Sequence, residues 1–254
     1  MYNDLFSIGP FTIHGYGLMI AIGIISAYFT AEHLAKKNGL DPEMMFGLAI
    51  SVVAAGFAGS KLLYIITVIP EIIKDPSYIK NVTSGWVVYG SLIGGIIALF
   101  IYCRVRKINP VAYMDVTLPA VALGQGFGRI GCFLAGCCYG METDSSFCVI
   151  FSHSDYAPNG VPLFPSQLVS SALNFLNFAV LFLILKKKPK TGVTSACYLL
   201  FYSIGRFCIE FFRGDLERGS VGIFSTSQFI AIWTAVFSVI LFIFSNRKKG
   251  ARID

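Results

Sequence analysis

Long apolar runs, separated by short polar segments, make up most of this sequence. A helix that crosses a lipid bilayer needs about 20 mostly apolar residues, and seven runs are close to or above that length. The runs cover residues 17–35, 47–69, 86–103, 113–138, 167–185, 193–212 and 226–245. The pattern therefore predicts an all-α integral membrane protein, a bundle of seven transmembrane helices that forms a single domain over residues 1–254.

The composition agrees with this class of protein. Hydrophobic side chains account for 55% of the 254 residues and charged ones for only 13%, whereas soluble domains carry roughly a quarter charged residues. No segment is long enough to fold as a separate soluble domain. The longest loop assigned to the outer side, residues 140–166, is expected to form a small cap that is too short for a core of its own.

Basic residues are concentrated on one side of the predicted membrane. Short cytoplasmic loops carry an excess of Lys and Arg, and the richest segments are residues 36–37, 104–107, 186–190 and 247–252. The opposite loops hold only Lys74, Lys80, Arg213 and Arg218. We therefore expect the amino terminus outside and the carboxyl terminus in the cytoplasm. This topology, with anionic lipid at the inner leaflet, explains the net charge of +6 without a nucleic-acid partner.

The amino-terminal segment, MYNDLFSIGPFTIHGYG, lacks the basic stretch and the small-residue cleavage site of a signal peptide. The first helix is therefore expected to be retained. Because the segment combines aromatic residues with Gly and Pro, we expect it to lie along the outer surface before the chain enters the membrane.

Three basic side chains, Lys61, Arg129 and Arg206, fall inside predicted spans. A charge inside the bilayer costs a few kcal/mol or more (~3), so such residues usually mark a site. Small residues surround them in AAGFAGSKLLY, YGSLIGG and GQGFGRIG. Such segments indicate close helix packing, or, next to a buried cation, a cavity. If these glycines border a cavity, it is expected to open toward the outer leaflet.

The segment YSIGRFCIEFFR adds a charged pair and a third arginine. Arg206 and Glu210 are four residues apart, so they lie on one helix face and can form an ion pair. Arg129 has no carboxylate nearby in the sequence, and Arg213 lies at the outer end of its helix. Three arginines against one glutamate leave positive charge near the outer leaflet, which predicts an anionic ligand such as a phosphate group.

Other polar residues lie toward the same outer ends of the predicted helices. A lone His or Tyr at such a position is usually an interfacial anchor, but together they can also belong to a site. They are His14, Tyr16, Tyr89, Ser166 and Gln167.

Taken in order, these segments resemble the prolipoprotein diacylglyceryl transferase family of bacteria. The similarity runs from SIGPFTIHGYGLM through GSKLLY, YGSLIGG, GQGFGRIG and FPSQL to YSIGRFCIEFFR. The resemblance implies a multi-pass protein of the bacterial cytoplasmic (inner) membrane. It implies transfer of the diacylglyceryl group of phosphatidylglycerol to the lipobox cysteine of a prolipoprotein at the outer leaflet, with release of glycerol phosphate. No cofactor or metal is expected.

The resemblance also implies roles for individual residues. Arg129 and Arg206 are expected to face the lipid phosphate and to stabilise the charge that grows on it. The substrate-binding residues are then expected to be Tyr16, Lys61, Gly90, Gly94, Ser166, Gln167, Tyr202, Glu210 and Arg213.

The chain departs from the family pattern at two places. After Arg129 the family signature usually has asparagines and a glutamate, where this chain has Cys132, Ala135 and Cys137. Tyr89 stands where the family often has a histidine, the usual proposed base. A tyrosine, with a reference pKa near 10, needs a neighbouring cation to act as a base. We therefore expect the catalytic base to be His14 or Tyr89.

Cys132, Cys137 and Cys138 leave several interpretations open. They can be small apolar filler in a packed helix, or Cys137 or Cys138 can form a disulfide with Cys148 outside the membrane. Metal ligation is disfavoured because the spacing matches no established site. A covalent intermediate on Cys137 is a further alternative.

The departures also leave alternative functions open. One is diacylglyceryl transfer from the same donor to another outer-leaflet acceptor, such as a glycan or a lipid headgroup. The other is a non-enzymatic lipid carrier, although the internal repeat that would favour it is not found.

Overall fold

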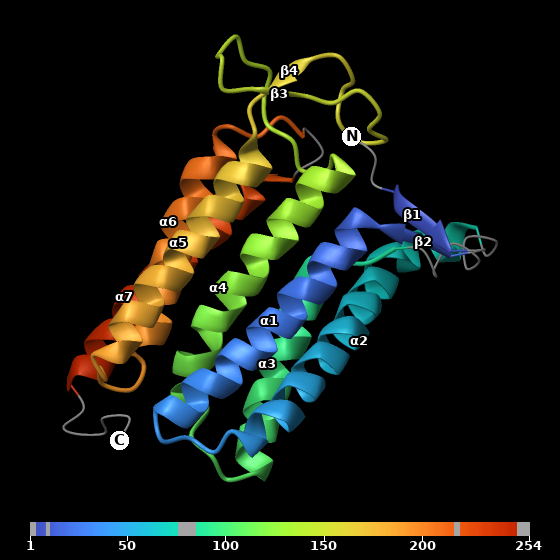
Figure 1. Cartoon of the computed structure of the whole chain (residues 1–254). Coiled ribbons are helices and arrows are strands. Elements are labelled where there is room, and N and C mark those ends of the chain that lie inside the picture. The colour runs from blue at the N-terminus through green and yellow to red at the C-terminus, as the bar shows by residue number, and fades with distance from the viewer. Residues whose placement is uncertain (1–3, 9–10, 76–84, 216–218, 248–254) are drawn as a thin grey trace. The chain divides into compact units, whose positions relative to one another are not determined.

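A computed structural model describes residues 4–8, 11–75, 85–215 and 219–247. These residues form seven helices, one for each predicted apolar run, with ends that differ by a few residues from the predicted ones (Figure 1). The helices are α1 (Gly15–Lys37), α2 (Glu43–Lys74), α3 (Val88–Val105), α4 (Pro110–Ala135), α5 (Ser166–Lys186), α6 (Val193–Glu210) and α7 (Thr226–Arg247).

Six of the seven helices are long and apolar enough to cross a membrane, which confirms the prediction of an integral membrane protein. The exception is α6, an 18-residue helix that carries Arg206 and Glu210. The charged residues that make α6 chemically interesting also make it the least apolar of the predicted spans.

The helices belong to two compact units. Unit 1 comprises residues 1–39 and 114–254, and unit 2 comprises residues 40–113. Unit 1 thus contains α1, nearly all of α4, and α5, α6 and α7. Unit 2 contains α2 and α3.

In the described part of the chain, three short antiparallel hairpins accompany the helices, and the sequence predicted none of them. They are β1 (Asp4–Ile8) with β2 (Phe11–His14), β3 (Val149–Ile150) with β4 (Pro162–Leu163), and β5 (Ser220–Val221) with β6 (Phe224–Ser225). The first hairpin occupies the amino-terminal segment and leads directly into α1. The second lies beyond the carboxyl end of α4 and the amino end of α5 (Figure 1).

Close packing between the helices of unit 1 depends on small and hydroxylated residues. A Cβ added at Gly23 of α1 would lie 3.0 Å from the carbonyl oxygen of Gly124 of α4. Ser171 Oγ of α5 donates a 2.8 Å hydrogen bond to the carbonyl oxygen of Gly126 of α4. An apolar cluster of Ala122, Leu181 and Tyr198 joins α4, α5 and α6. Helices approach this closely in membranes when small residues line their interface.

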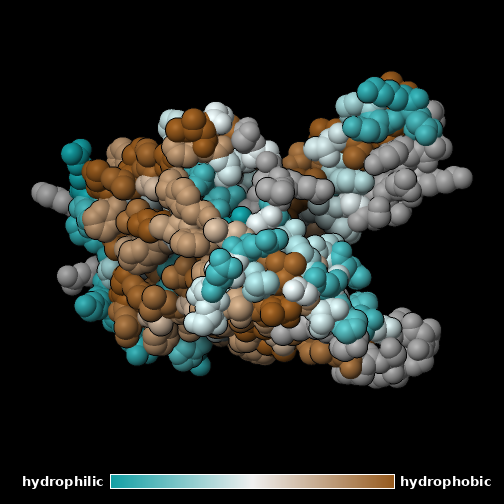
Figure 2. All heavy atoms as spheres, turned by 90° about the horizontal axis from the view of Figure 1, so that it is seen from above, coloured by the Kyte–Doolittle hydropathy of each residue, from teal (hydrophilic) through white to brown (hydrophobic). Residues whose placement is uncertain are grey.

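Large apolar side chains remain exposed along the helix flanks, where Figure 2 shows hydrophobic residues gathered. In unit 1 they include Phe29, Leu176, Phe237 and Phe244. A soluble protein rarely exposes so much apolar surface, whereas lipid tails accept it.

Unit 2 is held together by glycines at the α2–α3 interface. A Cβ added at Gly90 would meet the carbonyl oxygen of Gly59 at 2.2 Å, and one added at Gly94 would meet that of Ala55 at 2.3 Å. The two backbones are therefore in direct contact. Gly90 and Gly94 of YGSLIGG thus serve close packing against α2, and Gly94 also lines a surface hollow between the two helices.

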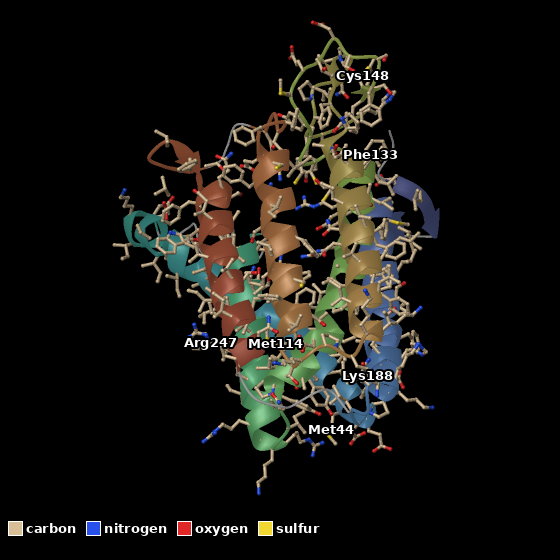
Figure 3. The ribbon with its side chains drawn as sticks, turned by 90° about the vertical axis from the view of Figure 1, so that its left-hand side faces the viewer. Met44, Met114, Phe133, Cys148, Lys188 and Arg247 are labelled. Atoms are coloured by element: carbon tan, nitrogen blue, oxygen red, sulfur yellow. The ribbon has the colours of Figure 1, made fainter. Side chains whose placement is uncertain are left out.

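The segment between α4 and α5 buries a small apolar cluster of its own. Phe151, Ala157 and Leu163 are almost fully buried and pack against Phe133, at the end of α4, and Tyr139. Residues 140–166 thus complete their apolar cluster with side chains from α4 and from the residue before the segment, rather than within the segment alone. Figure 3 shows Cys148 further out in this segment than Phe133, with Lys188 and Arg247 at the opposite end of the unit 1 helices.

Candidate functional site

A cavity of about 290 Å³ lies between α4, α5 and α6 of unit 1. Most of its lining is apolar, including Leu173, Val180 and Phe201. The polar residues on its walls are Arg129, Ser170, Asn174, Asn177, Tyr202 and Arg206. The structure thus brings together Arg129, Tyr202 and Arg206, three of the residues that the sequence singled out.

Arg206 is held by two partners. Its Nη1 lies 2.6 Å from Oε2 of Glu210, and its Nη2 donates a 2.7 Å hydrogen bond to Ser227 Oγ of α7. The Arg206 and Glu210 side chains are only 16% and 6% exposed. The ion pair predicted from the four-residue spacing is confirmed, and it fixes the guanidinium at the cavity wall.

Arg129 differs, because within the described part of the chain it has no carboxylate partner. Arg213 is paired with Asp215, through contacts of 3.1 and 2.7 Å from Nε and Nη2. The estimate of three arginines against one glutamate therefore overlooked Asp215. Of the three arginines, Arg206 and Arg213 each have a carboxylate partner, so the charge left uncompensated among the described residues is that of Arg129, which lines the cavity.

Sequence reasoning missed the polar residues of α5 on the cavity wall. Ser170, Asn174 and Asn177 follow one another at spacings of four and three residues, which places them on one helix face. A stripe of amides in an apolar span is a signal that the sequence offered. Asn177 is 7% exposed, and neither its Nδ2 nor its Oδ1 has a hydrogen-bond partner among the described residues.

Tyr202 reaches the cavity from α6 beside a second tyrosine. Its ring stacks on that of Tyr198 with centroids 5.9 Å apart. The Tyr198 hydroxyl in turn donates a 3.1 Å hydrogen bond to Oε1 of Gln125. The stack connects the wall of the cavity to the packed interior of unit 1.

The sulfurs of Cys132, Cys137 and Cys138 all lie within 4.8 Å of one another. The turn that ends α4 produces this cluster. Gly136 has a φ of +75°, and its N–H bonds the carbonyl of Phe133 while the Cys137 N–H bonds that of Cys132. These are the two hydrogen bonds of a Schellman motif, in which a glycine in the left-handed region ends the helix. The turn folds Cys137 and Cys138 back onto Cys132, which the sequence spacing did not reveal.

Ser166 and Gln167, both predicted as site residues, hold this turn from the start of α5. Ser166 Oγ donates a 3.0 Å hydrogen bond to the carbonyl of Cys138, and Gln167 Nε2 donates one of 3.0 Å to that of Cys137. Both side chains are 1% exposed. Cys138 adopts a φ of 58°, a conformation that is costly for a residue with a Cβ and persists only when its surroundings impose it.

The turn of residues 136–138, called the cysteine turn below, is also joined to the end of α6. The Met141 N–H donates to the carbonyl of Phe212, and the Gly214 N–H donates to that of Tyr139. Arg213 also interacts electrostatically with Cys138. The neighbouring Cys132 and Cys137 thiols, together with the charges of Arg213 and Arg129, lower the pKa of the Cys138 thiol.

All seven cysteines lie in the described part of the chain, and all are free thiols. The disulfide considered between Cys148 and Cys137 or Cys138 is therefore absent from the structure. Cys132, Cys137 and Cys138 have one another as neighbours instead.

The remaining predicted residues lie in several places. Tyr16, in the first turn of α1, interacts electrostatically with the three clustered cysteines and with Arg129. His14 Nδ1 lies 2.6 Å from Oδ1 of Asp4, and both side chains are more than half exposed.

Four predicted site residues belong to unit 2. Lys61 Nζ donates a 3.2 Å hydrogen bond to the carbonyl of Gly85 and lies 4.7 Å from the centroid of the Trp86 ring. Tyr89 is 42% exposed in the first turn of α3. Gly90 and Gly94 form the α2–α3 contact described above.

Comparison with known proteins shows strong similarity along the whole chain. Residues 3–244 match the family model described as prolipoprotein diacylglyceryl transferase. A phosphatidylglycerol–prolipoprotein diacylglyceryl transferase of Clostridium tetani is 41% identical over 96% of this chain and 98% of its own length. A second enzyme of that name from Clostridium perfringens is 42% identical over 94% and 93%. One from Staphylococcus aureus is 31% identical over 96% and 88%.

Proposed function

We propose, on the premise that this chain belongs to the prolipoprotein diacylglyceryl transferase family, that it transfers the diacylglyceryl group of phosphatidylglycerol to the lipobox cysteine of a prolipoprotein. The chain covers nearly the full length of relatives that carry this enzyme name. Nothing in the comparisons supports another acceptor or a non-enzymatic carrier.

The observation that carries the proposal is the position of Arg129. Arg129 lies on the wall of a largely apolar cavity and, among the described residues, has no carboxylate partner. An anionic headgroup with two acyl chains matches such a cavity, because the guanidinium can bind phosphoryl oxygens while apolar walls accept the chains. Arg206, opposite on α6, is the second arginine on the same cavity.

The reaction is an alkyl transfer with a phosphate leaving group. The acceptor sulfur attacks the carbon of the diacylglyceryl group that is bonded to the phosphate. The bond between this carbon and the phosphate oxygen breaks, and the headgroup leaves as glycerol phosphate with the electron pair. Arg129 and Arg206 stabilise the negative charge that grows on the phosphate. Tyr16, Tyr202, Glu210 and Arg213 shape the site around them.

The thiolate is the reactive form of the acceptor, so its proton must be removed. His14 and Tyr89 remain the candidate bases. The contact of His14 with Asp4 supports His14, since a carboxylate can orient the imidazole. We further assign substrate binding to Lys61, Gly90, Gly94, Ser166 and Gln167, the last two through the turn of residues 136–138 that they hold.

We also propose where the enzyme works. Seven spans in the cytoplasmic (inner) membrane of a bacterium, with the amino terminus outside, would place residues 140–166 as a small cap on the outer leaflet side. The basic residues at the ends of α5 and α7 support this orientation, because they lie away from that segment in unit 1 (Figure 3). A single functional domain over residues 1–254 is part of the same proposal.

A direct assay tests the function. Purified protein is incubated with phosphatidylglycerol labelled in its glycerol headgroup and with a lipobox peptide. We expect labelled glycerol phosphate to appear only with the peptide, and the peptide to gain the mass of the diacylglyceryl group. Release without the peptide, or a peptide of unchanged mass, would contradict the proposal. A peptide with serine in place of the lipobox cysteine is the matched control.

A further inference from the structure

Three thiols meet at the end of α4, where Cys132 lies one helical turn beyond Arg129 and Cys137 and Cys138 follow the helix. The sulfurs of Cys132, Cys137 and Cys138 lie within 4.8 Å of one another. Packing alone does not explain why the three sulfurs converge. The Schellman turn, the positive φ of Cys138 and two buried hydrogen bonds together bring them to one place.

We propose that Cys132, Cys137 and Cys138 bind a thiophilic metal ion of the Zn²⁺ type, and that the acceptor cysteine of the substrate becomes its fourth ligand. The site is therefore a catalytic metal site rather than a structural one. The second half of this statement rests on the function proposed above, whereas metal binding by the three cysteines does not.

The geometry suits such an ion. Tetrahedral coordination with zinc–sulfur bonds of about 2.3 Å places the sulfurs about 3.8 Å apart. Sulfurs that already lie within 4.8 Å of one another need only small side-chain rotations to reach this arrangement. Thiolate ligands favour Zn²⁺ or Cu⁺ over harder cations. Three protein ligands with one open position are the pattern of catalytic rather than structural zinc sites.

The surroundings hold the ligands in place. Ser166 and Gln167 bind the carbonyl oxygens of Cys138 and Cys137, and both are buried. A Cβ added at Gly136 would meet Ser154 Oγ at 2.1 Å, so the turn is also confined from the segment between α4 and α5. Such outer contacts orient metal ligands and tune the affinity of a site. Ser166 and Gln167 are thus positioning residues for the cluster.

The electrostatic environment fits a thiolate-rich site. A divalent ion with three thiolates carries one negative charge, and a fourth thiolate makes two. Arg213 and Arg129 both interact electrostatically with Cys138, and Arg129 also interacts with Cys132. These cations offset the excess charge, which would otherwise be costly near the membrane.

The position of the cluster suits the reaction. Cys132 follows Arg129 by three residues, a rise of about 4.5 Å along α4, and on the same face of the helix. When the acceptor thiol binds the metal, it gives up its proton more readily to the base proposed above, and the sulfur stays as a thiolate. Its lone pair then forms the carbon–sulfur bond while the carbon–oxygen bond breaks toward the phosphate at Arg129. The thioether product is a neutral, weaker ligand and dissociates.

Cobalt provides the test, because Co²⁺ replaces Zn²⁺ and reports its ligands in the absorption spectrum. The full chain in lipid nanodiscs is reduced with a phosphine, freed of metal with a chelator, and titrated with Co²⁺. We expect one ion per chain, a thiolate-to-cobalt charge-transfer band and the intense visible bands of a tetrahedral site. Adding the lipobox peptide should shift the visible bands, whereas the peptide with serine in place of cysteine should not.

Single variants assign the ligands. Cys132→Ser, Cys137→Ser and Cys138→Ser should each weaken Co²⁺ binding by more than about 100-fold, since even an outer contact of a metal site is worth 10- to 100-fold. Cys148→Ser, in the same outer segment, should bind Co²⁺ unchanged. Retained binding of phosphatidylglycerol shows that a variant is folded. Absence of Co²⁺ binding, binding that survives all three variants, or a spectrum that ignores the peptide thiol overturns the inference.

Turnover separates this inference from the proposed function. Metal-free protein should transfer at least about 100-fold more slowly, and Zn²⁺ should restore the rate. Full activity without metal would overturn the inference and leave the proposed function intact. A Co²⁺ spectrum that responds to the peptide, without transfer under any condition, would leave metal binding intact and reject the proposed function.

Discussion

Asp115 of α4 binds Ser195 at the amino end of α6 through both the main chain and the side chain of that serine. Its Oδ1 accepts a 2.8 Å bond from the Ser195 N–H and a 2.6 Å bond from the Ser195 hydroxyl, and its Oδ2 accepts the Gly192 N–H. Asp115 and Ser195 are fully buried. Gly192, the residue before α6, has no side chain to cap the helix. The Asp115 carboxylate from α4 therefore accepts the N–H groups of Gly192 and Ser195 at the start of α6.

Replacing Asp115 should therefore destabilise unit 1. Asp115→Ala leaves the buried N–H groups of Gly192 and Ser195 without partners, and we expect a loss of about 2–3 kcal/mol. Ser195→Ala removes only the hydroxyl contact and should cost about 1 kcal/mol. Thermal unfolding in detergent measures both. Equal midpoints for Asp115→Ala and the unmodified protein would show that the cap contributes nothing.

Arg129 and Arg206 should be needed for turnover but not for folding. Arg129→Ala and Arg206→Ala each remove charge from the proposed phosphate site, and we expect kcat to fall by at least about 100-fold. Arg129→Lys should be nearly as damaging, because an ammonium cannot form the two parallel contacts of a guanidinium. The glycerol phosphate assay measures this, with Lys188→Ala at the opposite end of unit 1 as control. A variant Arg129→Ala that keeps most of its activity would remove Arg129 from the mechanism.

Asn177 should be unfavourable for stability and favourable for substrate. Its buried amide has no protein partner among the described residues, so Asn177→Leu should raise stability by about 1 kcal/mol. If the amide bonds the lipid headgroup, the same change should raise KM for phosphatidylglycerol. Leu176→Asn, which adds an amide at the neighbouring position, is a useful comparison. Lower stability and unchanged KM in Asn177→Leu would show that the amide serves packing.

Gly136 should be required for the cysteine cluster. Ala at this position must adopt a left-handed conformation, which costs roughly 1–2 kcal/mol, and its Cβ meets Ser154 Oγ at 2.1 Å. Gly160→Ala is the matched control, because its φ is +77° but nothing lies within 4 Å of an added Cβ. We expect only Gly136→Ala to weaken Co²⁺ binding. Equal Co²⁺ affinity in both variants would show that the conformation of Gly136 is not needed for metal binding by the cysteines.

The sequence was sufficient for features that depend on local spacing. Apolar runs predicted each helix, and the four-residue spacing predicted the ion pair of Arg206 and Glu210. The cysteine cluster was different, because it depends on a turn that Ser166 and Gln167 hold from 28 and 30 residues away. The division into two units was equally hidden, since hydropathy marks which segments are apolar but not which of them pack together.

The amides of α5 were within reach of sequence reasoning. Asn174 and Asn177 interrupt an otherwise apolar run, and polar residues there are expensive unless they have a partner or a ligand. Attention to charged residues alone left them out. Asp215 was overlooked for a related reason, because its pairing with Arg213 is a contact between neighbours in a turn rather than a helical spacing.

The division of the chain has a consequence for its biosynthesis. Unit 1 is discontinuous, with α1 ahead of unit 2 in the sequence and α4 to α7 after it. During synthesis α1 reaches the translocon first, yet the face around Gly23 that receives Gly124 stays without its protein partner until α4 has left the ribosome. At about 5–20 residues per second this wait lasts several seconds. Over that interval α1 must be stabilised by lipid or by an insertion chaperone, whereas α2 and α3 can pair as soon as both have emerged.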